Sequence, residues 1–117
     1  MNYKDKKVYL ACGATDGRKA INGLSLLVQS SFNLDPFESA LFVFCNKNRD
    51  RLKILEWDGD GFWLHLKRLE QGRFKWPSAS CDEKIMILST EELAHLLGSP
   101  GLEQKLRRKQ IVEKLAV

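Results

Sequence analysis

The sequence predicts an α+β protein: an antiparallel β-meander of four to five strands, with one helix near the N-terminus and one or two helices at the C-terminus. Three observations support this prediction. Short apolar segments alternate with polar or glycine-containing turns between Leu41 and Pro77. An apolar stripe of helical spacing precedes these segments, and a helix-capping sequence follows them.

The first predicted elements are a strand and a helix. Val8 to Cys12 is expected to form a first strand, and the turn 13–16 follows it. Thr15 or Asp16 is expected to cap the helix, because either side chain accepts a hydrogen bond from an unpaired backbone N–H. Residues at three- and four-residue steps then form one buried stripe: Ile21, Leu24, Leu27 and Val28.

The middle of the chain predicts strands joined by tight turns. Leu41 to Cys45 is apolar on both faces and is therefore expected in the centre of the sheet. The polar turn 46–50 leads into a return strand, 52–57. Gly59-Asp60 is a suitable two-residue loop for a hairpin into the strand 62–69.

This hairpin has a defined register. The two-residue loop pairs Trp57 with Phe62 and Leu55 with Leu64, and Leu66 falls on the same face. The other face carries Ile54, Glu56, Trp63, His65 and Lys67. Arg73 to Trp76 is expected to form another short extended segment, which Pro77 ends.

The carboxyl-terminal part predicts a strand and helices. Ile85 to Leu88 is a candidate last strand, and Ser89-Thr-Glu-Glu92 is a capping box for a helix that ends near Leu97. Ser99-Pro-Gly101 is a break, after which the pattern is again helical. We therefore divide the chain into a single α+β domain, 1–98, and a divergent helical tail, 99–117.

Composition limits the classes of function. With 44% hydrophobic and 29% charged residues, the 117-residue chain has the composition of one globular domain. Its apolar runs are too short for a membrane span, and its first residues lack the pattern of a secretion signal. Three widely spaced cysteines, Cys12, Cys45 and Cys81, suit buried thiols in the cytoplasm better than disulfides or a zinc site.

The candidate functional residues lie between Trp57 and Pro77. Cations and aromatic side chains alternate there, which is a pattern suited to phosphates and to bases that can be stacked upon. The same pattern also arises when aromatic residues fill the core and cations face water. The candidate nucleic-acid-binding residues are Lys67, Arg68, Arg73, Lys75, Trp63 and Trp76.

Arg18 and Lys19 are secondary candidates for a phosphate contact, next to the expected start of the first helix. The segment is not a Walker loop, because three residues rather than four separate Gly13 from Gly17. A capped helix with solvated charges explains the same residues without a ligand.

Other sites are less well supported. Asp58 and Asp60 lack the remaining ligands of a calcium loop and are accounted for by the turn, although a metal-dependent nuclease cluster with Asp35 and Asp50 is conceivable. The two histidines, His65 and His95, accompany no recognisable nucleophile motif. We therefore assign no catalytic residue, no metal site and no cofactor. Residues 89–117 also permit a helix-turn-helix, although a solvated amphipathic tail explains them more simply.

Several segments in order resemble the small TnpB accessory protein of the bacterial IS-sixty-six insertion sequences. The similarity runs from about Val8 to Leu97 and departs from the family pattern at Ala14, at Gly17 and after Gly98. The segments that carry it are Val8-Tyr-Leu-Ala-Cys-Gly13, Thr15-Asp-Gly-Arg-Lys19, Asp35-Pro-Phe37, Leu41-Phe-Val-Phe44, Lys53-Ile-Leu55, Trp57-Asp-Gly-Asp-Gly61, Lys67-Arg-Leu-Glu-Gln-Gly-Arg-Phe74 and Trp76-Pro77.

The resemblance implies a helper in transposition, encoded beside a separate, larger transposase. The family is assigned no catalytic centre, so the expected protein is not an enzyme. From the residues and the resemblance together we expect a cytoplasmic accessory protein that binds DNA through its basic-aromatic hairpin. The alternative is an adaptor that docks on the transposase without contacting DNA itself.

Overall fold

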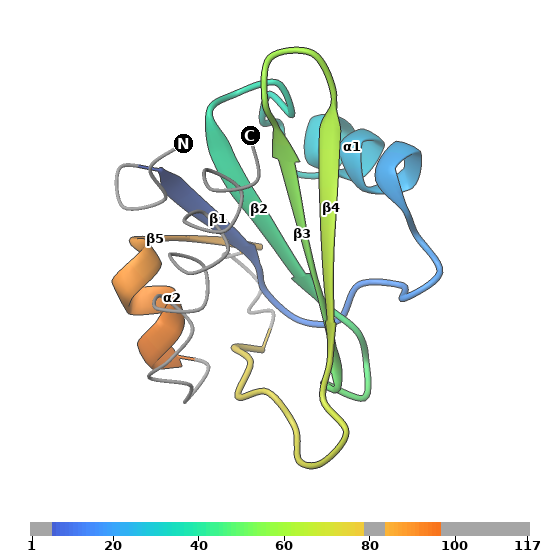
Figure 1. Cartoon of the computed structure of the whole chain (residues 1–117), viewed down its shortest axis with the longest axis vertical. Helices are drawn as coiled ribbons and strands as arrows, with labels where there is room; N and C mark the ends of the chain where they lie inside the picture. Colours follow the sequence, from blue (N-terminus) through green and yellow to red (C-terminus); the bar gives the residue numbers. More distant parts are fainter. Residues whose placement is uncertain (1–5, 79–83, 97–117) are drawn as a thin grey trace, which may run out of the picture.

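A computed structural model of the chain describes residues 6–78 and 84–96. These residues form a five-stranded sheet with one helix on each face (Figure 1). The elements in chain order are β1 Lys7–Ala11, α1 Ile21–Ser30, β2 Ala40–Cys45, β3 Arg51–Trp57, β4 Phe62–Arg68, β5 Ile85–Leu88 and α2 Thr90–Leu96. The α+β class is therefore confirmed.

The sheet is mixed, so the prediction of a purely antiparallel meander is wrong. The strand order is β4-β3-β2-β1-β5, with β1 parallel to β2 and the other neighbours antiparallel. The parallel pair arises because α1 carries the chain back across the sheet between β1 and β2. As expected, β2 is central and buried along its whole length.

The β3–β4 hairpin has the predicted register. Trp57 pairs with Phe62, Leu55 with Leu64 and Glu56 with Trp63. The backbone N–H of Asp58 donates to the carbonyl oxygen of Gly61 at 3.1 Å, which leaves the expected two-residue loop.

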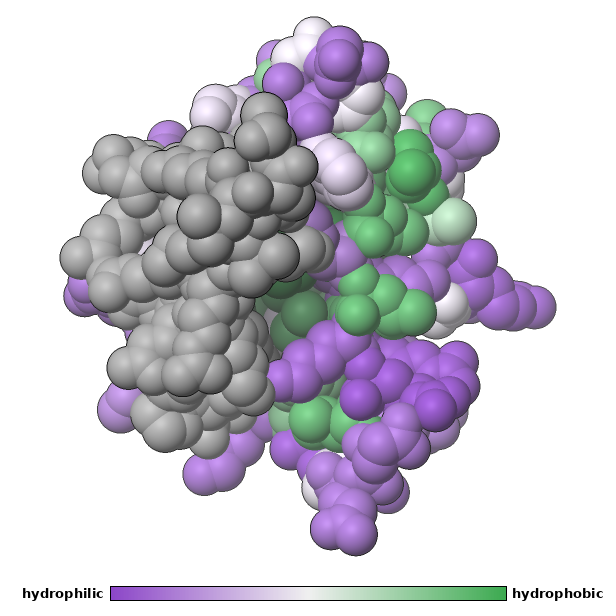
Figure 2. All heavy atoms as spheres, in the orientation of Figure 1, coloured by the Kyte–Doolittle hydropathy of each residue, from purple (hydrophilic) through white to green (hydrophobic). Residues whose placement is uncertain are grey.

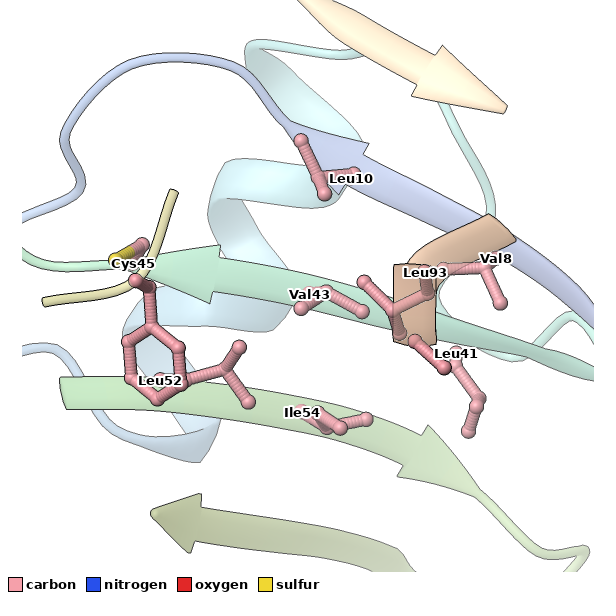
Figure 3. Packing of buried hydrophobic residues seen from close by; sticks show 10 residues of the cluster. Val8, Leu10, Leu41, Val43, Cys45, Leu52, Ile54 and Leu93 are labelled. Atoms are coloured by element: carbon pink, nitrogen blue, oxygen red, sulfur yellow. The ribbon is translucent and has the colours of Figure 1, made fainter. Parts of the chain in front are cut away.

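Each face of the sheet has its own hydrophobic core. On one face α1 buries Leu24 and Val28 against Phe42 and Leu55. On the other face Leu93 of α2 reaches the apolar side chains of β1, β2 and β3 (Figure 3). Successive residues of β2 belong to the two cores alternately, as the pleat of a strand requires.

The two helices begin differently. Helix α2 has the predicted capping box: the N–H of Glu92 donates to Ser89 Oγ at 3.0 Å, and the N–H of Ser89 donates to Glu92 Oε1 at 3.2 Å. The predicted cap of α1 is wrong, because its N-cap is Ala20, without a side-chain hydrogen bond. Asp16 instead accepts from the N–H of Arg18 at 2.9 Å, which forms a separate local turn.

One predicted extended segment is not a strand. Residues 73–76 join no sheet, and the fifth strand is β5 instead. The N–H of Phe74 donates to the carbonyl oxygen of Arg49 at 2.7 Å, so the segment docks on the β2–β3 turn. The helix expected from Leu102, and with it the whole tail 99–117, lies outside the described residues.

Candidate nucleic-acid interface

Three loops meet at one end of the sheet, where β1 and β2 both finish. They are residues 12–20, the turn Asn46–Asp50 and the segment 69–78. The N–H of Thr15 donates to Cys45 O, and the N–H of Gly13 donates to Pro77 O, both at 2.8 Å. We call this end, with its three loops and the start of β5, the basic end; the turn 46–50 and the segment 69–78 lie at the bottom of Figure 1.

The turn at the basic end is built around Asn46. Its Oδ1 accepts from the N–H groups of Asp50 and Arg51, and its Nδ2 donates to Asp50 Oδ1 at 2.7 Å. These bonds fix the backbone of Lys47, Asn48 and Arg49, whose side chains are exposed.

The segment 73–77 presents its cations outward and its aromatic rings inward. Phe74 is 4% exposed and belongs to the core under α2, and Trp76 is partly buried against the same core. The indole Nε1 of Trp76 donates to Ala11 O at 2.9 Å. Arg73 and Lys75 alternate with these rings and are exposed.

Positive charge is concentrated at the basic end. Besides Arg18 and Arg68, which have acidic partners, its exposed cations are Lys47, Arg49, Arg51, Arg73, Lys75 and Lys84. The acidic residues that the described loops place there each bond to a neighbour: Asp16 to Arg18, Asp50 to Asn46 and Glu70 to Arg68. The lower right of the visible face is mostly hydrophilic (Figure 2). Acidic residues occupy the opposite end, where the β3–β4 turn and the loop before β2 lie: Asp35, Glu38, Asp58 and Asp60.

Arg18 and Lys19 lie at the basic end but have different surroundings. The guanidinium of Arg18 contacts Asp16 Oδ2 at 2.9 Å, and this hydrogen bond holds the pKa of the Asp16 carboxyl well below its usual value. Lys19 is partly buried, and its carbonyl oxygen accepts from Lys53 Nζ at 2.7 Å. Lys53 also donates to Gly17 O at 2.8 Å and so ties this loop to β3.

The predicted residues on β4 point in two directions. One face of β4 carries Trp63, His65 and Lys67; it is the face of the sheet on which α2 packs against β1 and its neighbours. Arg68 lies on the opposite face, on which α1 packs. Arg68 donates to Glu70 Oε1 at 2.9 Å, so its charge is partly compensated.

Trp63 lies apart from the cations. It is 52% exposed, but its Nε1 donates to Asp58 at the acidic end of the hairpin. Its ring stacks on His65, with centroids 6.2 Å apart. The structure therefore brings Trp76, Arg73 and Lys75 together and leaves Trp63 at the other end of the hairpin.

The alternative sites have structural explanations. Asp58 Oδ1 accepts from the N–H of Gly61 at 3.2 Å, and the hydrogen bond from Trp63 lowers the pKa of Asp58. Among residues 6–78 and 84–96, no three His, Cys, Asp or Glu side chains gather as a metal site would require. Burial raises the pKa of the Cys45 thiol to about 11, so little reactive thiolate forms there near neutral pH. No helix in these ranges is long and apolar enough to cross a bilayer.

Sequence reasoning missed several cations of this site: Lys47, Arg49, Arg51 and Lys84. A usable signal was present, because the order strand, helix, strand over residues 8–45 is typical of a parallel pair with a helical crossover. The carboxyl ends of two parallel strands lie at the same edge. This rule would have brought the turn after Cys45 beside Gly13 and Ala14.

Comparison with known proteins agrees with the resemblance read from the sequence. The chain matches the family described as IS66 Orf2 like protein over residues 6–107. The match extends beyond Gly98, after which the sequence was expected to depart from the family pattern. It is 40% identical over 91 residues to protein y4hO of Sinorhizobium fredii, covering 78% of this chain and 77% of that protein. It is 35% identical over 106 residues to protein y4jC of the same organism, covering 90% of this chain and 87% of that protein.

Both relatives are described only as uncharacterized proteins, and no solved structure matches the chain. The family match spans most of the sequence and includes all three loops of the basic end. The chain therefore belongs to the IS66 Orf2-like family of accessory proteins associated with transposition.

Proposed function

We propose that this protein is a non-enzymatic accessory protein that contacts DNA through its basic end while an insertion sequence is transposed in the cytoplasm. The observation that supports this most is the separation of charge between the two ends of the sheet. The net charge is only +4, yet exposed cations cluster at the end where three loops meet. A surface of this kind attracts a polyanion far more strongly than the net charge suggests.

The contact is made chiefly to phosphates. Arg73 and Lys75 are exposed on a segment whose aromatic residues pack on the core, Phe74 fully buried and Trp76 partly buried. Lys47 and Arg49 project from a turn that side-chain hydrogen bonds hold in place. Cations on a fixed backbone neutralise phosphates and release counterions, which makes binding weaken as salt rises. Arg18 and Arg68 contribute less, since each has an acidic partner.

Lysine variants at the two ends of the sheet test this proposal. Lys75→Gln removes one exposed charge from the basic end, and Lys7→Gln removes one exposed charge from the opposite end of β1. Binding to a labelled duplex is followed by fluorescence anisotropy over a range of salt concentrations. Lys75→Gln is expected to reduce the slope of log affinity against log salt by about one, and Lys7→Gln to leave it unchanged. Equal slopes for both variants would refute the basic end as the DNA contact.

A second candidate function is a protein-protein adaptor that docks on the transposase. Its support is the exposed apolar side chains of the edge strand β4, where Trp63 is 52% exposed on one face and Leu66 is 61% exposed on the other. Tryptophan is a frequent anchor of protein interfaces. A pull-down with purified transposase, with and without nuclease, separates the two functions. Capture that survives nuclease and is lost in Trp63→Ala, but not in Lys75→Gln, would favour the adaptor.

A further inference from the structure

A hollow of about 180 Å³ lies at the basic end, where the three loops meet. Gly13 and Ala14 form its floor after β1, the turn after β2 forms one wall, and Trp76 and Pro77 form another. It opens beyond the carboxyl ends of the only parallel strand pair in the described sheet. Ligands of sheets with parallel strands commonly bind at this edge.

The walls of the hollow combine two cations with one aromatic ring. Lys47 and Arg49 line it from the turn, and Trp76 lines it from the docked segment. Cations beside an aromatic ring are the combination with which proteins hold single-stranded nucleic acid, because the cations bind phosphate while the ring stacks on a base.

Three hydrogen bonds hold the aromatic wall in place. The indole Nε1 of Trp76 donates to Ala11 O, and the flanking residues bond to both neighbouring loops, Phe74 N to Arg49 O and Gly13 N to Pro77 O. Binding a flat ring here costs little ordering of the protein.

The cationic wall carries backbone strain. Arg49 has φ of +60°, a left-handed conformation that asparagine or glycine adopts more easily. Strained residues of this kind are concentrated at binding sites, where the surrounding structure holds them. Here the hydrogen bonds of Asn46 to Asp50 and Arg51 provide that support.

We propose that this hollow binds one unpaired nucleotide of a DNA strand, with its phosphate on Lys47 and Arg49 and its base against Trp76. The inference rests on the proposed function, since it names the form of DNA that the basic end prefers. The hollow is smaller than the pockets of about 300 Å³ or more that hold drug-sized ligands, so it suits a single unit of the strand. A base within a duplex is covered by its neighbours on both sides and cannot stack on the ring.

The bound DNA strand can continue from this hollow into a neighbouring one. A second hollow of about 370 Å³ shares Ala14 with the first and is lined by Lys19 and Lys84, and by Asp16, whose carboxylate is paired with Arg18. The adjacent phosphate therefore meets further cations. This arrangement suits a nucleotide within or at the end of a strand better than a free mononucleotide.

Competition between two forms of DNA tests the inference. A labelled, 5′-phosphorylated oligothymidylate is displaced either by the unlabelled oligomer or by relaxed, covalently closed circular plasmid at equal phosphate concentration. The wild-type protein is expected to prefer the oligomer by about tenfold. Lys47→Gln/Arg49→Asn is expected to abolish this preference, whereas Lys75→Gln weakens binding to both forms alike. Asparagine is chosen at position 49 because it accepts the left-handed backbone.

The outcomes separate the two proposals. If both DNA forms bind equally well to the wild-type protein, or if the double variant keeps the preference, the nucleotide site is refuted while DNA binding stands. If neither form binds, the proposed function fails and the nucleotide site with it. Circular dichroism of each variant checks that the fold is retained.

A fluorescence measurement tests the position of the base. Trp57→Phe/Trp63→Phe leaves Trp76 as the only tryptophan of the chain. Oligothymidylate is expected to quench its emission, and the added Lys47→Gln/Arg49→Asn change to remove the quenching. Binding of the oligomer with unchanged Trp76 emission would refute the contact between the ring and a base.

Discussion

At the scale of single residues, the most unusual group is the carboxylate of Glu56. Its residue is 1% exposed, and its two oxygens contact Lys6 Nζ at 2.8 Å and His65 Nε2 at 3.3 Å. Burial alone would raise the pKa of Glu56, but the hydrogen bonds from His65 and Lys6 outweigh it and lower the pKa. Glu56 therefore remains charged and joins the residue before β1 to the edge strand β4.

Removal of this charge should destabilise the fold. Glu56→Gln leaves the Lys6 ammonium buried without its counter-charge, so we expect the free energy of unfolding to fall by about 3 kcal/mol. Glu70→Gln is the matched control, because Glu70 pairs with Arg68 at the surface and should change stability by about 1 kcal/mol or less. Urea denaturation at neutral pH measures both. Equal losses of unfolding free energy for the two substitutions would mean that the buried Glu56–Lys6 pair stabilises the fold no more than the exposed Glu70–Arg68 pair.

The same group predicts a pH dependence. The pKa of Glu56 is lower in the folded chain than the ordinary value of 4.5, which the unfolded chain is expected to have. Its stabilising contribution is therefore complete well above that pH and is lost as the pH falls through the folded pKa. The difference in unfolding free energy between the wild-type protein and Glu56→Gln should shrink as the pH is lowered from neutral. A difference that stays constant in acid would show that Glu56 is not the titrating group.

At the scale of elements, the β3–β4 hairpin shows how a turn sets a register. Gly59 has φ of +105°, which a residue with a side chain rarely adopts, and the Asp58 carboxylate accepts from the backbone of the same turn. The turn thereby fixes Trp57 opposite Phe62, and every later pair follows from the strand period of two.

Two glycines of this turn provide a matched pair of substitutions. Nothing lies within 4 Å of a Cβ placed at Gly59 or at Gly61, so neither change to alanine creates a clash. Only Gly59 has a left-handed backbone. Gly59→Ala should therefore lower the free energy of unfolding by about 1–2 kcal/mol, while Gly61→Ala should not lower it. Thermal unfolding of both variants measures the difference, and similar losses in melting temperature would rule out backbone strain as its cause.

Some elements were predictable from the sequence and others were not, for physical reasons. The hairpin register and the capping box of α2 depend on residues close together in the chain, so local pattern was sufficient. The pairing of β1 with β2 and with β5 depends on distant segments, and alternation of apolar residues does not reveal which strands are neighbours. The prediction that Asp16 caps α1 was wrong because its carboxylate accepts a hydrogen bond from the backbone N–H of Arg18, which lies before the helix.

At the scale of the whole molecule, the important property is where charge lies rather than how much there is. The sequence correctly marked Arg73 and Lys75 as exposed cations, because each alternates with an aromatic residue. It did not show that Trp63 and Trp76 lie at opposite ends of the sheet. In the structure Trp63 bonds to Asp58 and Trp76 bonds to the carbonyl oxygen of Ala11. The position of Trp76 depends on the parallel pair of β1 and β2, whose following loops meet the segment 69–78 at one end of the sheet.

The most direct test of DNA binding at the basic end is a nuclear magnetic resonance titration of the isotope-labelled protein with a short DNA duplex. Amide chemical shifts report every residue at once, and a 13.4 kDa chain is small enough for their assignment. The largest shift changes should fall in residues 13–19, 46–51 and 73–77, with little change around Asp58 and Asp60. Shift changes centred on Trp63 and the β3–β4 turn, or none at low salt, would contradict the account.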